Sequence, residues 1–186
     1  MNLKGCMAVW AVLAIGGYAL QSCNTAPVKE VWLDELGQDS CYVQDWGTVE
    51  INRSVVLTPL TVNGIVYERG LGAHSISRIL YDLKSEAVSI SGLAGADDNN
   101  RFAGKLQFKI VGDQKELWKS GVMKKGDPVK EFNVSLKGVD KVLLLVEECG
   151  DGIMYDHADW LNVKIETRGD VKPVRAWAKS IAKEKY

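Results

Sequence analysis

The feature that most constrains the fold is a series of short apolar–polar alternations between Val31 and Glu166. Apolar side chains occupy every second position in these runs, which is the period of a β-strand with one buried face. No window of this region carries the i, i+3, i+4, i+7 apolar stripe that a core helix needs. The clearest alternating sets are Ile79, Tyr81 and Leu83; Leu106, Phe108 and Ile110; Phe132, Val134 and Leu136; and Leu161, Val163 and Ile165.

Turn sequences separate these runs at regular intervals. Asn63-Gly64 stands between β-branched residues and is the strongest short hairpin signal in the chain. Gly112–Lys115 and Lys137–Asp140 are further turns, and Val142–Val146 is apolar on both faces, as in a central strand. We therefore predict an all-β chain that folds as a single β-sandwich of jelly-roll type.

The charge balance narrows the classes of partner. The 186 residues include 23 Lys and Arg against 24 Asp and Glu, and 46% of them are hydrophobic. This composition excludes a disordered chain. A net charge of −1 argues against nucleic acid as a partner, because nucleic-acid binders normally carry a basic excess.

Residues 1–22 have the pattern of a bacterial lipoprotein signal peptide. Lys4 precedes an apolar stretch that ends in Leu20-Gln21-Ser22-Cys23, and a cysteine in this position is the acylated first residue of a lipoprotein. We expect an extracytoplasmic chain, lipid-anchored to a bacterial membrane through Cys23, with the outer membrane or cell surface as its location and residues 23–30 as a tether. An ordinary secretory signal or a membrane anchor is the alternative.

The two cysteines outside the predicted signal peptide and lipidation site could form a disulfide bond. Cys41 and Cys149 would be free to pair in an oxidising compartment, and two independent buried thiols are the alternative.

The alternating strand pattern ends at Glu166, and the tail that follows is rich in Ala and Lys. We predict a linker-like tail over residues 167–186, in which Val174, Trp177 and Ile181 mark a short helix or a docking segment.

Three polar clusters stand out in the sequence: Trp46-Gly47 with Asn52–Ser54, Glu68–Ser75 with the loop Gly95–Arg101, and Gly150–Gly152 with Tyr155–Trp160. Polar and charged loop residues beside tryptophans suit a sugar site, because an aromatic face stacks on pyranose C–H bonds while Arg, Asn and Asp side chains bind hydroxyls. The alternatives are core packing for the tryptophans and structural hydrogen bonds for the histidines. The candidate carbohydrate-binding residues are Trp46, Arg53, His74, Asp98, Arg101, His157 and Trp160.

Acidic residues in the same clusters raise two further hypotheses. Asp97, Asp156 and Asp159 could supply oxygen ligands for a calcium ion, although they lack the EF-hand spacing. Carboxylate pairs that include Glu147 could also hydrolyse glycosides. No Gly-x-Ser-x-Gly elbow or other nucleophile motif occurs, so we expect no catalytic residues.

Taken in order, these clusters resemble the NPCBM family (novel putative carbohydrate-binding module), also classed as carbohydrate-binding module family 51. The resemblance implies a galactose-binding-domain-like jelly roll over residues 31–166 that binds galactose-containing glycans. Family members are usually appended to secreted glycosidases, including α-galactosidase-like enzymes, and some hold a structural calcium ion. The matching segments are Val31–Leu36, Gln44–Gly47, Pro59-Leu60, Asn63-Gly64, Tyr67–Ser75, Gly95–Asp98 and Asp156–Trp160.

We therefore expect a non-catalytic carbohydrate-binding module of a bacterial lipoprotein, with galactosides as ligands and a glycoside hydrolase as its partner or origin. Two alternatives stay open at this point. The domain could be the orienting module of a truncated glycoside hydrolase without a sugar site of its own, or it could be a glycosidase itself.

Overall fold

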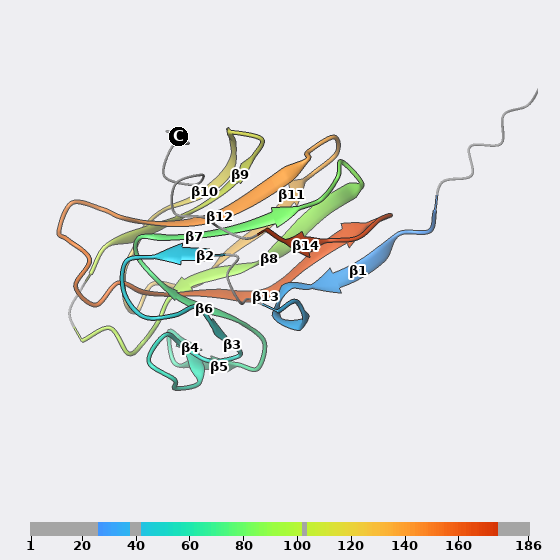
Figure 1. Ribbon diagram of the computed structural model, residues 1–186. Coiled ribbons are helices and arrows are strands. Elements are labelled where there is room, and N and C mark those ends of the chain that lie inside the picture. Colours follow the sequence, from blue (N-terminus) through green and yellow to red (C-terminus); the bar gives the residue numbers. More distant parts are fainter. Residues whose placement is uncertain (1–25, 38–41, 102–103, 175–186) are drawn as a thin grey trace, which may run out of the picture.

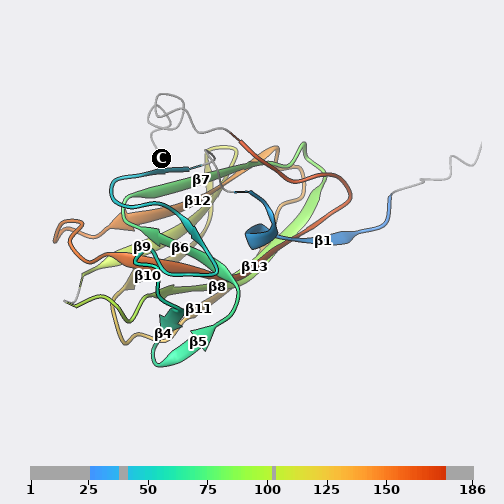
Figure 2. The same cartoon turned by 60° about the horizontal axis from the view of Figure 1, so that its bottom comes forward.

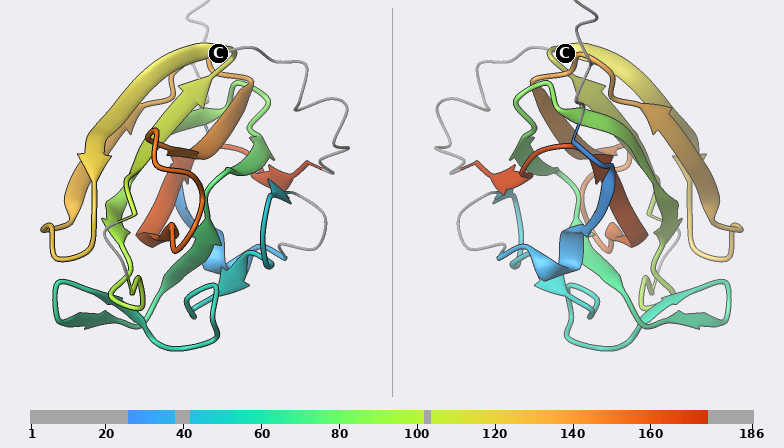
Figure 3. Two further views of the ribbon diagram at one scale, coloured as in Figure 1. Left: turned by 90° about the vertical axis from the view of Figure 1, so that its left-hand side faces the viewer. Right: turned by 90° about the vertical axis from the view of Figure 1, so that its right-hand side faces the viewer.

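The computed structural model describes residues 26–37, 42–101 and 104–174, and two antiparallel sheets stack face to face in it (Figure 1). Sheet A has the order β11-β8-β13-β6-β3, with β1 also paired to β13. Sheet B has the order β10-β9-β12-β7-β14, with β2 also paired to β7. The two layers are seen end-on in Figure 3.

The chain crosses repeatedly from one sheet to the other. Those of sheet A are β1 (Lys29–Trp32), β3 (Glu50–Ile51), β6 (Gly70–His74), β8 (Ala87–Ala96), β11 (Lys130–Ser135) and β13 (His157–Thr167). Those of sheet B are β2 (Tyr42–Gln44), β7 (Ser77–Asp82), β9 (Leu106–Gly112), β10 (Lys115–Met123), β12 (Lys141–Glu148) and β14 (Lys172–Pro173). A hairpin of β4 (Leu60–Val62) and β5 (Ile65–Tyr67) completes the described strands, and one 3-10 turn, η1 (Leu33–Glu35), is the helical element among them.

The core lies between the inner faces of the sheets, and the alternating positions of the sequence fill it. Trp160 of β13 is fully buried at its centre. Its ring packs edge-on against those of Phe108 in sheet B and Phe132 in sheet A, with ring centroids 4.9 and 5.7 Å apart. The prediction of a β-sandwich without a core helix is confirmed for the described residues.

A β-bulge changes the orientation of β13 halfway along its length. Asn162 adopts a φ of 51°, and the pairing of β13 with β8 shifts register between Leu161 and Lys164. Val163 and Ile165 consequently belong to the main core, whereas Leu161 faces away from it. The sequence pattern had placed these three residues in one simple alternation, so the bulge corrects that expectation.

The β4–β5 hairpin covers the outer face of sheet A. Leu60 and Val62 bury Leu161 in a second small core (Figure 2). Asn63 and Gly64 have φ values of 49° and 76°, which a type I′ turn requires, so the predicted hairpin is confirmed. This hairpin makes part of sheet A buried on both faces.

The ends of the domain differ from the predicted boundaries. β1 begins at Lys29, within the expected tether, and β14 pairs with β7 inside the expected linker, so residues 167–174 belong to the sandwich. The predicted signal peptide, Cys23, Cys41 and residues 175–186 lie outside the described residues. In the part of the chain that is described, no helix is long and apolar enough to cross a membrane.

The backbone of Gly72 in β6 packs closely against the backbone of Arg53 and Ser54, and a substitution at Gly72 tests this packing. A Cβ atom at this position would lie 2.2 Å from the backbone oxygen of Arg53, too close for any real contact. We expect Gly72→Ala to lower the free energy of unfolding by about 3 kcal/mol, measured by urea denaturation. Gly37→Ala is the control, because its Cβ would meet nothing within 4 Å. Equal stability of the two variants would contradict this packing.

Candidate functional site

Two histidines form the floor of the site because two strands bring them into register. His74 ends β6, His157 begins β13, and the two residues are direct cross-strand partners. Their ring centroids lie 5.6 Å apart. The two histidines of the chain, 83 positions apart in sequence, therefore become neighbours through strand pairing alone.

Trp46 forms a wall beside these rings. Its indole lies nearly parallel to the His157 ring, with centroids 5.9 Å apart and an interplanar angle of 8°. It also lies 5.1 Å from the His74 ring. Trp46 is 49% exposed, so its other contacts leave a large aromatic surface open to a ligand.

Gln44 holds the Trp46 segment against the floor. Its side-chain amide donates a hydrogen bond to the carbonyl oxygen of Trp46 at 2.8 Å, and its amide oxygen accepts one from the backbone N–H of His74 at 3.0 Å. The sequence analysis placed Gln44 in a segment that matches the family but assigned its side chain no role.

A pocket of about 520 Å³ opens beside these three rings. This volume is in the range of small-molecule sites. The lining combines aromatic rings, polar side chains and an aliphatic rim, and its residues are Trp46, Val56, His74, Asn99, Arg101, Ile153, Met154, Tyr155 and His157.

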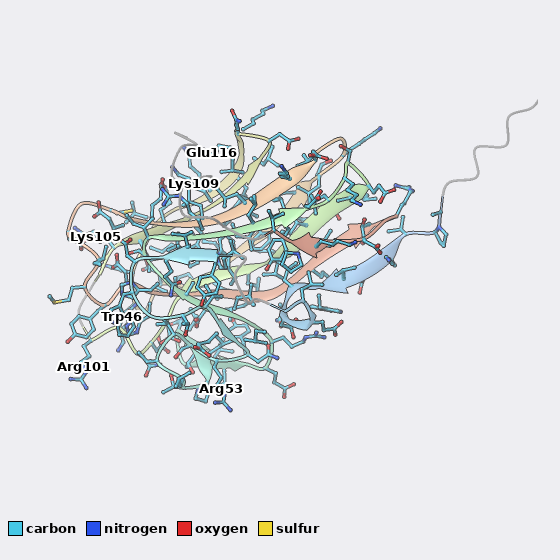
Figure 4. The ribbon with its side chains drawn as sticks, viewed as in Figure 1. Trp46, Arg53, Arg101, Lys105, Lys109 and Glu116 are labelled. Carbon is cyan, nitrogen blue, oxygen red and sulfur yellow. The ribbon has the colours of Figure 1, made fainter. Side chains whose placement is uncertain are left out.

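Four of the predicted sugar-binding residues meet in this pocket: Trp46, His74, Arg101 and His157. Trp46 and Arg101 lie at the same end of the molecule in Figure 4. Asn99, Met154 and Tyr155 also line it and were not predicted individually, although Asn99 and Tyr155 stand in the loop clusters that the sequence singled out.

Both imidazoles are neutral at pH 7. Burial lowers the pKa of His74 and that of His157, and the proximity of His74 lowers the pKa of His157 further. The Nδ1 of His74 faces the carbonyl oxygen of Ser75, which can only accept, so Nδ1 carries the proton and Nε2 is left as an acceptor. The floor therefore offers hydrogen-bonding groups without charge.

Asn100 fixes the position of His157. Its side-chain oxygen accepts the backbone N–H of His157 at 2.8 Å, and its amide donates to the His157 carbonyl oxygen at 3.0 Å. Asn100 is fully buried. This bidentate pairing ties the loop after β8 to the start of β13, which explains why two loops far apart in sequence form one pocket.

Asp156 braces the neighbouring turn. Its carboxylate accepts the Ser75 hydroxyl at 2.6 Å, and its carbonyl oxygen accepts the backbone N–H of Ser75. Burial raises the pKa of Asp156 to about 6, and the hydrogen bond from Ser75 opposes that rise. The predicted calcium ligand is thus a structural acid of the turn.

Asp97 and Asp98 hold the β4–β5 hairpin. Asp98 accepts the backbone N–H groups of Asn63 and Gly64 at 3.1 and 2.7 Å. Asp97 accepts that of Asn99 at 2.7 Å and that of Thr61 at 3.3 Å. Asp98, predicted to bind sugar, therefore stabilises a turn and does not line the pocket.

Asp159 lies beside Asp97 and is fully buried. Neither of its oxygens makes a well-formed hydrogen bond with a donor in the described part of the chain. Burial and the charge of the neighbouring Asp97 raise the pKa of Asp159 well above its ordinary value.

These contacts do not fit a calcium site. Both oxygens of Asp97 accept N–H groups, and Asp156 accepts a hydroxyl elsewhere. Calcium requires six to eight oxygen ligands. Within residues 26–37, 42–101 and 104–174, no group of three or more His, Cys, Asp or Glu side chains could hold a metal ion. The three carboxylates therefore do not form one ligand group in the described residues, and a bound calcium ion stays a prediction.

Two further predictions need correction. Trp160 is fully buried in the core and cannot stack on a sugar. Arg53 lies in a separate hollow with Leu57 and Val66, and Figure 4 shows it away from Trp46. Sequence alone could not separate an inward tryptophan from an outward one, because both stand next to polar residues.

Cys149 is half-buried, and burial raises the pKa of its thiol. It forms no disulfide with another described residue. Cys41 lies outside them, so a bond between the two stays a prediction.

A family model decides what kind of domain this is. The model of the NPCBM/NEW2 domain matches residues 29–166, which is most of the chain. The chain belongs to the NPCBM/NEW2 domain family. The resemblance drawn from the loop motifs is thereby confirmed.

Two curated relatives carry the same kind of segment. A putative endo-alpha-N-acetylgalactosaminidase of Renibacterium salmoninarum is 29% identical over 162 residues, which are 84% of this chain and 11% of that protein. Alpha-1,3-galactosidase B of Akkermansia muciniphila is 29% identical over 130 residues, 68% of this chain and 16% of that protein. The chain therefore spans only a small part of the length of these relatives.

Solved structures of CBM51 modules share the fold. The CBM51 of Clostridium perfringens GH95, in complex with methyl-galactose, is 25% identical with a TM-score of 0.67, and the match covers 74% of this chain and 99% of that one. The M60 catalytic domain with two CBM51 domains of Clostridium perfringens ZmpB is 30% identical with a TM-score of 0.68, covering 76% of this chain and 15% of that one. These matches confirm a jelly-roll sandwich of galactose-binding-domain type.

The buried acid pair gives the stability a distinctive pH dependence. Because the folded-state pKa of Asp159 is raised, the folded protein favours the protonated carboxyl group. The resulting contribution to the free energy of unfolding is complete below about pH 4, the ordinary pKa of an aspartate, and is lost as the pH rises through the folded-state pKa. In Asp159→Asn the amide can donate permanently to Asp97. We expect this variant to exceed the wild type in stability at pH 8 by about 1 kcal/mol or more, with a smaller difference at pH 5.

Denaturant unfolding at both pH values measures this difference. Glu131→Gln on the exposed side of β11 is the control and should leave the pH dependence unchanged. A destabilised Asp159→Asn variant at pH 8 would show that an ionised Asp159 is needed in this position.

Proposed function

We propose that this chain is a non-catalytic carbohydrate-binding module and that the pocket beside Trp46 holds a galactose-type sugar. The observation that carries the proposal is the half-exposed Trp46 ring, held parallel to His157 at the wall of a 520 Å³ pocket. A pyranose has one face of C–H groups that stacks on such a ring.

A sugar also needs partners for its hydroxyl groups, and the polar side chains that line the pocket can supply them. His74 presents Nε2 as an acceptor, and Arg101 presents N–H donors at the pocket. The side-chain amide of Asn99 already donates to Thr58 and Asp97, so its oxygen is the group that it can offer to a hydroxyl. An axial hydroxyl distinguishes galactose from glucose, and it projects from the ring plane toward groups set beside a stacking platform. The side chains are therefore arranged for sugar hydroxyls and apolar C–H faces together.

The relatives support the choice of sugar. One solved CBM51 structure contains methyl-galactose, and both curated relatives have names of enzymes that act on galactose or N-acetylgalactosamine linkages. We infer that the module directs a glycoside hydrolase, in the same chain or in a partner, to galactose-containing glycans. The module itself does not cleave them, because the acids of its site are used as braces: Asp98 for a hairpin and Asp156 for a turn.

Binding should depend on Trp46 and not on Arg53. We expect Trp46→Ala to weaken the binding of methyl-galactoside at least tenfold, because the stacking surface is lost. Isothermal titration with methyl-galactoside, and with the methyl-glucoside epimer for specificity, measures this. Arg53→Ala is matched in exposure but lies in another hollow, so its affinity should equal that of the wild type. A flat titration of the folded wild type would contradict the proposal.

Binding should also weaken in acid. The lowered pKa values keep His74 and His157 neutral at pH 7, and protonation would turn the Nε2 acceptor of His74 into a donor. We expect a constant affinity between pH 7 and 8 and a loss of affinity at pH values below the lowered histidine pKa values. Titrations across this range test the prediction, and His74→Gln should remove most of the acid-dependent loss. An affinity that rises in acid would show that the cationic rings bind the ligand.

A further inference from the structure

Arg101 is the one charged side chain among the described residues that line the sugar pocket, because the two histidines are neutral at pH 7. Its side chain is exposed, and its guanidinium group forms no ion pair with another residue of the described ranges. A guanidinium group keeps its positive charge at every pH that a protein meets. The pocket therefore presents an uncompensated cation to its ligand.

Two other hollows of the molecule contain charges of both signs. The hollow beside the β4–β5 hairpin has Arg53 and Glu68 in its lining, and the hollow on sheet B has Lys141 with Asp113 and Asp140. The sugar pocket, in contrast, has no carboxylate among its described lining residues. Since the chain has 24 acidic and 23 basic residues, this imbalance is a local feature of the pocket and does not follow from the composition.

The acidic residues of the surrounding loops are held elsewhere. Asp97 and Asp98, which precede Arg101 in the same loop, accept backbone N–H groups of the β4–β5 hairpin. Asp156 accepts the Ser75 hydroxyl. None of these three carboxylates lines the pocket. The described part of the chain thus supplies no counter-ion for Arg101, and a ligand is the group that can supply one.

A neutral sugar would leave this charge uncompensated. A ligand that fills the pocket excludes water from the guanidinium group, and removing water from a charge costs free energy unless an opposite charge or well-placed hydrogen-bond partners replace it. A sulfate ester or a carboxylate meets this requirement best, because the guanidinium group donates two parallel hydrogen bonds to two oxygens of the same group. A sugar hydroxyl can accept from Arg101 but does not neutralise it.

The loop that carries Arg101 is fixed next to the stacking platform. Trp46 follows β2 and Arg101 follows β8, and Figure 4 shows their side chains at the same end of the molecule. Asn100, the residue before Arg101, is held by its two hydrogen bonds to the backbone of His157. A pyranose ring can therefore lie on Trp46 while a substituent at its edge points to Arg101.

We propose that the pocket takes a galactoside that bears an acidic group, either a sulfate ester or a carboxylate, and that Arg101 binds this group. The inference rests on the proposed function, because it adds a substituent to the sugar that the pocket holds. Arg101 is then a specificity-determining residue. Trp46 binds the ring that all galactosides share, and Arg101 distinguishes acidic galactosides from neutral ones.

The test compares neutral and acidic probes by isothermal titration of the full chain at pH 7. The probes are methyl-galactoside, its 3-sulfate, its 6-sulfate and methyl-galacturonide, so that a sulfate ester and a carboxylate are distinguished. We expect at least one acidic probe to bind the wild type about tenfold more tightly than methyl-galactoside, as one charge-assisted contact provides. High salt should reduce this advantage and leave the affinity for methyl-galactoside unchanged.

Two matched variants locate the source of the advantage. Arg101→Gln should bring the affinity for the acidic probes to within about threefold of that for methyl-galactoside, because the charged fork is lost. Arg53→Gln removes the same charge from an exposed arginine in another hollow and should keep the tenfold advantage. Melting temperatures equal to that of the wild type show that both variants are folded.

Equal affinities of the wild type for neutral and acidic probes would overturn this inference and leave the proposed function standing. An advantage that survives in Arg101→Gln would overturn it too, because another group would then bind the acid. An equal loss in Arg53→Gln would show that net charge alone is the cause. A wild type that binds no probe would overturn the proposed function together with the inference.

Discussion

The pairing of β13 with β6 on one side and β8 on the other sets the position of nearly every important side chain. In its first half, Ala158 and Trp160 point into the core, and His157, Asp159 and Leu161 point to the opposite face. A shift of one residue in this register would put the tryptophan in the site and the histidine in the core. The paired histidines and the buried acid therefore depend on the same hydrogen-bonded ladder.

The polar residues around the site are used mainly to hold loops. Side-chain hydrogen bonds to backbone groups join the loops that meet at the ends of β6 and β13. Gln44 holds the Trp46 segment, Asn100 holds the start of β13, and Asp98 holds the hairpin. Apart from Arg101, the pocket lining consists of aromatic, aliphatic and neutral polar groups, which keeps the cost of removing water from the pocket low.

Much of the architecture was readable in the sequence because strand period, turn chemistry and burial agree locally. The I′ turn at Asn63-Gly64 and the doubly apolar run of β12 were predicted and are confirmed. The bulge at Asn162 was not, since a non-glycine residue with positive φ has no reliable sequence signal. The same limit applies to the aspartates, whose side chains brace turns or lie buried beside one another according to neighbours that lie far away in the sequence.

By itself, the sequence determined an all-β chain of the NPCBM family with sugar-binding residue types in its loops, because these depend on local pattern and on ordered motifs. Only the tertiary structure decided that Trp46 faces a pocket and Trp160 the core. It also decided that Arg53 is remote, and that the acids brace loops where ligands for a metal had been expected. The physical reason is that strand register and long-range pairing, which no local pattern encodes, determine which face of a sheet each side chain occupies.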